Sequence, residues 1–269
     1  MRIETILKPA SLEDAYKAIA ADKNAVVFAG GAWIKLTLKD IATAVLLDGL
    51  GLERIAVGDK TVEIGALATL NDVATHPVLS GLYGGMIAES CRRVMGINVQ
   101  NVATLGGSVM GGYAFSDILT ALLAADATLR FQKHEPMKLA EYLQRKVNFR
   151  DLLVAISIPL KNGRGVFRKI ARTRLDFAIL NLAVTNVNGL YLIAVGARPG
   201  VARLATLAAD RLNEIHPVSV FDIEKAVADA LAELDFGSNN RAAEDYRRAL
   251  ARVHLLRALK EVTFDDRQR

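Results

Sequence analysis

Two glycine-rich segments carry the residues best suited to ligand chemistry. The first is AVVFAGGAW (residues 25–33), a short apolar run that leads directly into Gly30 and Gly31. The second is NVATLGGSV (residues 101–109), which a helix-patterned run follows at Ser116. A glycine lets the backbone approach a ligand closely, and bare backbone N–H groups bind anions such as phosphates. Together the two segments predict a site for a phosphate-bearing cofactor.

Other kinds of chemistry find little support in the sequence. The spacing G-x-G-x-x-G is absent from both glycine segments, so they do not form a Rossmann fingerprint. The histidines show no metal-ligand spacing, and no Ser/His/Asp set stands out. We therefore expect no metal site and no nucleophilic catalysis, and we expect a bound cofactor to supply the chemistry.

The elements before residue 53 are those that should position the first glycine segment. The pattern predicts a strand at residues 3–8, a helix from Leu12 with Ser11 and Asp14 as its N-terminal cap, and strands at 25–30 and 45–50. This is a small β-α-β unit in which one strand ends in the glycines.

A different pattern surrounds the second glycine segment. We expect a hairpin about Gly58 and Asp59, and then a short helix capped by Thr69 and Asp72. Further helices are predicted at 83–94, 116–125 and 135–144, and strands at 127–131 and 151–160.

The rest of the chain predicts a third style of fold. A linker at 162–165 leads to a strand at 165–172, and Asn188-Gly189 lies between two apolar runs as a hairpin signal. Helices at 219–234 and 240–262 complete the pattern. The predicted division is therefore 1–52, 53–162 and 163–269.

Composition limits the class of protein. The chain has 269 residues, is 52% hydrophobic and contains one cysteine, Cys91. No apolar run approaches the roughly 20 residues that span a bilayer, and the first residues lack the pattern of a signal peptide, so we expect a cytoplasmic protein. One thiol cannot hold an iron–sulfur cluster, which needs about four ligands. Because the basic residues behind the net charge of +5 are scattered, nucleic-acid binding is not expected.

Several motifs in a fixed order resemble one family. They are AGG (29–31), IGALATL (64–70), NVATLGGSV (101–109), FSDILTALLAADA (115–127), KIARTRLDFAILNLAV (169–184), VGARP (195–199) and DYRRALARVHLLRAL (245–259). In this order the chain resembles, over nearly its whole length, the FAD-binding subunit of molybdenum hydroxylases, the xanthine dehydrogenase and carbon monoxide dehydrogenase group.

The resemblance implies both a fold and a set of cofactor contacts. The expected fold is a two-subdomain α/β FAD-binding region of the vanillyl-alcohol oxidase (PCMH) type, followed by a C-terminal α+β domain with an antiparallel sheet and helices. Neither glycine segment contains a His or Cys for tethering, so FAD should be held non-covalently. The residues implied as FAD contacts are Val27, Ala29, Gly30, Gly31, Ala32, Trp33, Thr104, Gly106, Gly107, Ser108, Asp117, Leu153 and Lys169.

Each implied contact has a simpler structural alternative. The backbone from Ala29 to Trp33 is expected to donate to the FAD pyrophosphate, although the glycines could merely end a strand, and Trp33 itself is more readily explained by packing. Asp117 is expected to bind cofactor hydroxyls, or else to interact with the helix dipole. Lys169 is either near the flavin or solvated, and Leu153 either contacts the flavin through its backbone or fills the core.

Three positions depart from the pattern of the family. Many relatives have Thr or Ser in place of Ala32, Arg in place of Gln100, and Asn in place of Ser108. These differences affect local hydrogen bonds rather than the expected fold.

The implied function is electron transfer within a molybdenum hydroxylase complex. A molybdopterin subunit would oxidise the substrate, a 2Fe-2S subunit would pass single electrons, and this chain's FAD would deliver them to NAD or another acceptor. Two alternatives stay open. A stand-alone FAD-dependent oxidase or dehydrogenase would need its own acid/base residues, and an interaction subunit that has lost FAD would fit the departures at Ala32, Gln100 and Ser108.

Overall fold

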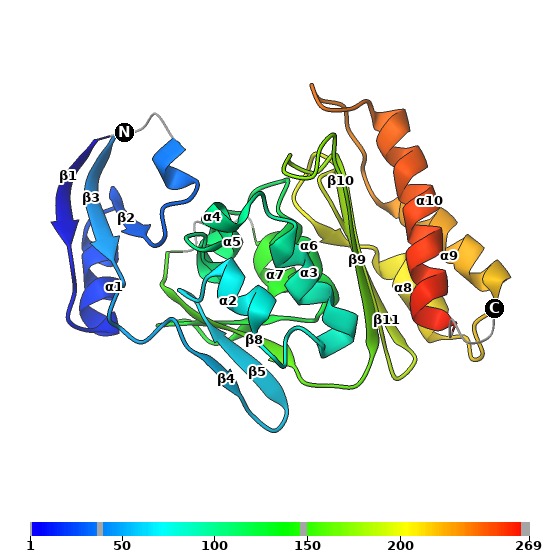
Figure 1. Ribbon diagram of the computed structural model, residues 1–269, viewed down its shortest axis with the longest axis horizontal. Coiled ribbons are helices and arrows are strands. Elements are labelled where there is room, and N and C mark those ends of the chain that lie inside the picture. Colours follow the sequence, from blue (N-terminus) through cyan, green and yellow to red (C-terminus); the bar gives the residue numbers. More distant parts are fainter. Residues whose placement is uncertain (1, 37–39, 146–149, 265–269) are drawn as a thin grey trace.

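The computed structural model describes residues 2–36, 40–145 and 150–264. The strands of these residues form three sheets, arranged along the longest axis of the molecule (Figure 1). We name the parts built on them the N-terminal unit (β1 to β3), the central unit (β4 to β8) and the C-terminal unit (β9 to α10).

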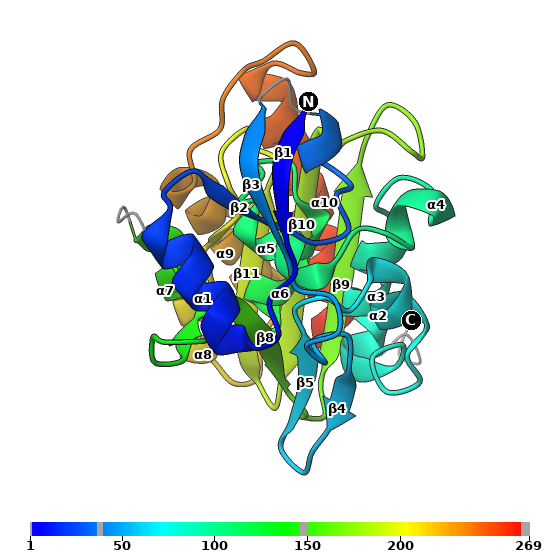
Figure 2. The ribbon, with the colours of Figure 1, turned by 90° about the vertical axis from the view of Figure 1, so that its left-hand side faces the viewer.

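The N-terminal unit is a parallel sheet with one covering helix. It consists of β1 (Ile3–Leu7), α1 (Leu12–Ala21), β2 (Ala25–Phe28), η1 (Ile34–Leu36) and β3 (Ile41–Leu46), in the strand order β1-β3-β2. Figure 2 shows this unit in front of the rest of the molecule. The Ser11 side chain accepts a hydrogen bond from the backbone N–H of Asp14, so the predicted cap is confirmed.

One strand prediction in this unit is wrong. The strand expected at 45–50 occupies Ile41–Leu46 instead, paired on both sides with β1 and β2. The chain turns away immediately afterwards, because Gly49 and Gly51 adopt φ of +84° and +75°, values that an L-residue in a strand does not adopt. The turn signal at Asp48-Gly49 outweighs the apolar run before it.

The central unit is an antiparallel sheet, order β4-β5-β8-β6-β7, with helices on it. Its strands are β4 (Ile55–Val57), β5 (Thr61–Gly65), β6 (Thr128–Phe131), β7 (Met137–Lys138) and β8 (Leu153–Pro159). Its helices are α2 (Leu70–Thr75), η2 (Leu82–Gly85), α3 (Met86–Arg92), α4 (Ile97–Gln100), α5 (Leu105–Met110), α6 (Asp117–Ala124) and α7 (Leu139–Gln144). The hairpin at Gly58-Asp59 and the capping box of Thr69 and Asp72 are confirmed.

Helix α6 joins the central and C-terminal units. All its residues are buried, and it packs on β10 and β11 of the next sheet as well as on α3 and α5. Its last turn is tied to that sheet, because the Thr185 hydroxyl donates to the Ala124 carbonyl at 2.7 Å. A helix that is largely apolar on every side is stable only in such a buried position.

The C-terminal unit is an antiparallel sheet with α6 on one face and helices on the other (Figure 1). It comprises β9 (Arg164–Ile170), β10 (Leu180–Val187), β11 (Leu190–Gly196), β12 (Arg203–Leu204), α8 (Thr206–Asn213), α9 (Val220–Glu233) and α10 (Glu244–Thr263). Asn188 and Gly189 have φ of +54° and +85°, as expected for the predicted two-residue hairpin. The sequence did not predict α8. Within the described ranges, no helix has the length and apolar character needed to cross a membrane.

Candidate cofactor site

A cavity of about 300 Å³ lies between the N-terminal and central units. One wall comes from β2 and the segment after it, and the other from the β5 to α2 turn, α5 and the start of β8. Every residue predicted to contact FAD lines this cavity except Asp117 and Lys169. The structure therefore brings together two glycine segments that are far apart in the sequence.

The first glycine segment offers unpaired backbone donors to the cavity. The N–H groups of residues 30, 31, 32 and 33 donate no hydrogen bond within the described part of the chain. The segment also packs tightly on the second one, because a Cβ on Gly30 would lie 1.4 Å from the Val102 carbonyl oxygen. Gly31 has φ of +67°, a conformation that favours glycine.

The glycines of the second segment do not offer such donors, and for them the prediction of bare N–H groups is wrong. The segment forms helix α5, in which the N–H groups of Leu105 and Gly106 donate to the carbonyls of Ala68 and Ala66, both at 2.9 Å. The N–H of Gly107 donates to the Thr104 hydroxyl at 3.1 Å. These donors are used to dock the helix on the β5 to α2 turn and to cap it.

What the second segment provides is space. Gly107 is exposed and lines the cavity, and a Cβ added to it would meet only the Thr104 hydroxyl, at 2.8 Å. Gly106 is buried, and its Cβ would lie 2.6 Å from the Ala66 carbonyl oxygen. The two adjacent glycines therefore differ: Gly106 permits helix packing, and Gly107 keeps the cavity wall free of side-chain atoms.

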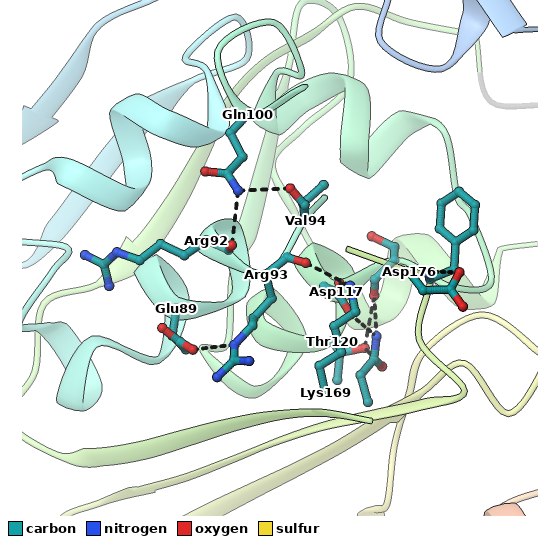
Figure 3. A network of polar contacts seen from close by, with 12 residues as sticks. Glu89, Arg92, Arg93, Val94, Gln100, Asp117, Thr120, Lys169 and Asp176 are labelled. Carbon is teal, nitrogen blue, oxygen red and sulfur yellow. Dashed lines mark hydrogen bonds and ion pairs between the residues drawn. The ribbon is translucent and has the colours of Figure 1, made fainter. Parts of the chain in front are cut away.

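Two of the positions that depart from the family's pattern have structural roles. The Ser108 hydroxyl donates to the Thr104 carbonyl at 2.9 Å, within α5. The Gln100 amide donates to the carbonyls of Arg92 and Val94, at 3.1 and 3.0 Å (Figure 3). Both polar side chains stabilise the backbone around the site.

Asp117 and Lys169 lie beside the cavity rather than on its wall. They line a separate cleft of about 30 Å³, which shares Trp33, Ser108 and Tyr113 with the large cavity. Their carboxylate and ammonium groups are 2.9 Å apart, and their side chains are only 4% and 5% exposed. The alternative of a solvated lysine is therefore wrong.

Hydrogen bonds satisfy the rest of this buried pair. The Lys169 ammonium donates to the Arg93 carbonyl at 2.8 Å, and the Asn181 amide donates to the Asp117 carboxylate at 2.7 Å (Figure 3 shows the pair and Arg93). Burial raises the pKa of Asp117 above its usual range, because desolvation outweighs the attraction of the Lys169 ammonium. The arrangement fixes an ion pair against the small cleft.

Aromatic rings from all three units line the cleft. Trp33 follows β2, Tyr113 and Phe115 precede α6, and Phe177 lies between β9 and β10. Ring centroids are 5.6 Å apart for Trp33 and Phe177, and 4.2 Å apart for Phe115 and Phe177. These contacts fit the packing role expected for Trp33, which also lines the cavity.

The sequence reasoning missed part of the cavity wall, above all Asp151. Its carboxylate accepts hydrogen bonds from the backbone N–H groups of Lys133, His134 and Leu152 at 3.0, 2.9 and 2.7 Å, and lies 2.7 Å from the His134 ring. Burial alone would raise the pKa of Asp151, but these hydrogen bonds lower it overall. The only signal was its place two residues before Leu153. Other lining residues not predicted are Ile34, Leu47, Ala66, Leu67, Ala103, Met110, Gly111, Tyr113 and Leu152.

The residues present fit a dinucleotide cofactor such as FAD. The unpaired N–H groups of the first segment are suited to a pyrophosphate, and the bare wall at Gly107 leaves room for it. The remaining wall is largely apolar, as is usual for cofactor sites. Among the described residues, no group of three His, Cys, Asp or Glu side chains is placed to hold a metal ion.

Fold and site together define a flavoprotein subunit. Residues 2–161 match the family described as "FAD binding domain in molybdopterin dehydrogenase", and residues 165–262 match the "CO dehydrogenase flavoprotein C-terminal domain". The chain belongs to this FAD-binding family of molybdopterin dehydrogenases. The predicted fold, the cofactor FAD and the class, an oxidoreductase subunit, are thereby confirmed.

Individual relatives cover nearly the whole chain. The glyceraldehyde dehydrogenase medium chain of Sulfolobus acidocaldarius is 22% identical, over 94% of this chain and 95% of its own. The nicotine 6-hydroxylase medium subunit of Paenarthrobacter nicotinovorans is 24% identical over the same shares. A chain of the carbon monoxide dehydrogenase from Hydrogenophaga pseudoflava, solved without the Mo-pyranopterin moiety, has the same fold, with a TM-score of 0.88, 21% identity and 97% of each chain covered.

Proposed function

We propose that this chain is the FAD-containing electron-transfer subunit of a molybdenum hydroxylase complex. In this role it passes electrons from iron–sulfur centres on a partner subunit to NAD or another acceptor. The observation that carries the proposal is the cavity between the N-terminal and central units, with unpaired N–H groups on one wall and the bare Gly107 on the other. The full-length match to medium chains of such enzymes supports it.

Each wall of the cavity has its own part in holding the cofactor. The N–H groups of residues 30–33 bind and orient the pyrophosphate, and the apolar residues Val27, Leu152 and Leu153 exclude water from the remainder. The Asp117 and Lys169 pair lies at the edge of the site. There the carboxylate is expected to face hydroxyl groups of the cofactor, and the ammonium group to face the flavin ring. A bound flavin supplies the redox chemistry, since it takes up electrons singly and releases them in pairs.

The other redox centres belong to partner subunits. A single cysteine cannot ligate an iron–sulfur cluster, so the 2Fe-2S centres must lie on another chain of the complex. The molybdopterin is likewise assigned to a partner subunit, as in the carbon monoxide dehydrogenase relatives. The relatives named as a medium chain and a medium subunit fit such an assembly. With one buried thiol and no requirement for disulfides, the cytoplasm is the proposed location.

The test is to separate the chain from its partners. The purified chain should bind FAD, seen as flavin absorbance bands and as quenching of its single tryptophan, Trp33, which lies on the cavity wall. It should oxidise no purine, aldehyde or N-heterocycle alone. Stopped-flow absorbance should show flavin reduction by the complex's substrate once the iron–sulfur and molybdenum subunits are added.

Two results would favour the other functions. Turnover of an organic substrate by the isolated chain would overturn the electron-transfer role in favour of a stand-alone flavoenzyme. A colourless protein that cannot be reconstituted with FAD would favour an interaction subunit.

A further inference from the structure

One arginine connects the two units that enclose the cavity. Arg150 lies just before β8 in the central unit, and its guanidinium donates four hydrogen bonds to carbonyls of the N-terminal unit. Nε donates to Ile19 at 2.5 Å, Nη1 to Lys23 at 3.0 Å, and Nη2 to Asp22 and Ala25 at 2.5 and 3.1 Å. The Arg150 side chain therefore contacts both the end of α1 and the turn that leads into β2.

The position of Arg150 in the chain gives these contacts a consequence for the cavity. On its own side, the next three residues, 151–153, line the central wall. On the other side, Ala25 is the first residue of β2, which runs directly into the glycine segment of the opposite wall. A shift of the guanidinium would therefore change how the N-terminal wall sits against the central wall.

The chemistry of the contact favours a rigid connection. Carbonyls at a helix C-terminus lack partners within the helix, and a cation there is favoured by the helix dipole. The planar guanidinium presents five N–H donors in a fixed fork, whereas an ammonium group has three donors on one atom. Nearby, Lys133 pairs with Glu13 of α1 at 2.6 Å and lies over the Tyr16 ring, but this pair is partly exposed and contributes little by itself.

We infer that Arg150 is a positioning residue for the cofactor. It holds the N-terminal unit against the central unit and so keeps the unpaired N–H groups of residues 30–33 at the distance that FAD requires. The inference rests on the proposed function, because it takes FAD to be the occupant of the cavity. A preformed site binds more tightly, since less ordering is required when the ligand arrives.

The test compares Arg150→Gln and Arg150→Lys with Arg130→Gln. Arg130 is a matched control, because its guanidinium pairs with Glu63 at 2.8 Å within the central sheet and, among the described residues, contacts nothing across the cavity. FAD affinity is measured by quenching of Trp33, and amide hydrogen exchange of residues 19–28 is measured without FAD. Arg150→Gln should raise the Kd for FAD about tenfold or more and speed exchange at 19–28, with a smaller effect for Arg150→Lys and none for Arg130→Gln.

The outcomes separate this inference from the proposed function. Wild-type FAD affinity in Arg150→Gln would overturn the inference while leaving the function intact. If the wild-type chain bound no FAD, the proposed function would fail, and unchanged exchange at residues 19–28 in Arg150→Gln would then overturn the positioning role as well. Should Arg150→Gln fail to fold, the FAD affinity and amide exchange of Arg150→Lys decide between the same outcomes. This variant keeps the positive charge and removes the planar guanidinium.

Discussion

Adjacent glycines in α5 should separate cofactor binding from folding. In Gly107→Val, the new Cβ meets only the Thr104 hydroxyl, so the folding cost is the loss of the helix cap, about 1 kcal/mol. Replacing a helical glycine by alanine gains roughly 0.5–1 kcal/mol, and the β-branched valine gains less. The free energy of unfolding should therefore change by less than about 1 kcal/mol. The valine methyl groups, however, would extend into the cavity.

The binding cost follows from overfilling a close-packed site. Extra methyl groups in such a site cost roughly 1–3 kcal/mol, which corresponds to a Kd for FAD weaker by about tenfold to a hundredfold. Gly106→Ala should do the opposite. Its Cβ would lie 2.6 Å from the Ala66 carbonyl oxygen and 2.7 Å from the Ala66 Cβ, so it should lower stability by a similar amount. For a chain of this size that means a Tm lower by about 2–4 °C for each kcal/mol.

The assay measures each property alone. Thermal unfolding of the apoprotein, followed by circular dichroism, reports stability, and quenching of Trp33 reports FAD affinity. Wild-type affinity in Gly107→Val, or equal losses of Tm in the two variants, would refute the assignment of Gly107 to the cavity wall and of Gly106 to the packing.

Further predictions concern the other groups around the site. Acid precipitation should release all flavin into the supernatant, because neither glycine segment offers a His or Cys for a covalent bond; colour in the washed pellet would contradict this. Burial raises the pKa of Cys91 to about 12, so the native thiol should resist a thiol reagent such as Ellman's at pH 8 and react only after unfolding. Because the pKa of Asp151 is lowered in the fold, its stabilising effect is present above the usual aspartate pKa of about 3.9 and lost as pH falls further; urea midpoints of wild type and Asp151→Asn should converge below about pH 4. Lys169→Met leaves the buried Asp117 carboxylate unpaired and should cost about 3–5 kcal/mol in urea unfolding, with part regained in the double variant with Asp117→Asn; additive losses would show that the pair is not coupled.

Local signals in the sequence predicted the parts of the fold that depend on neighbouring residues. The capping box at Thr69 and Asp72 and the hairpin at Asn188-Gly189 each follow from a few adjacent residues. The resemblance then placed the glycine segments in one site, which spacing alone could not have done.

Tertiary contacts explain what the sequence could not predict. The second glycine segment reads as a loop, yet it is helical because Leu105 and Gly106 donate to carbonyls of a distant turn. The pairing of Asp117 with Lys169 joins a helix start to a strand of another unit. Arg150 contacts carbonyls of residues 19–25, which precede it by 125 to 131 residues, so no local pattern could reveal these contacts.

The buried ion pair is better explained by function than by stability. Removing an aspartate and a lysine from water costs several kcal/mol for each ion, and apolar residues of similar volume often give an equally stable core. The fold nevertheless keeps Asp117 and Lys169 side by side, supplying the Arg93 carbonyl and the Asn181 amide as further partners. The cleft that they line shares Trp33, Ser108 and Tyr113 with the large cavity. A lysine ammonium that is shielded from water interacts with negative charge on a neighbouring ligand far more strongly than an exposed ammonium does, because the local dielectric constant is low.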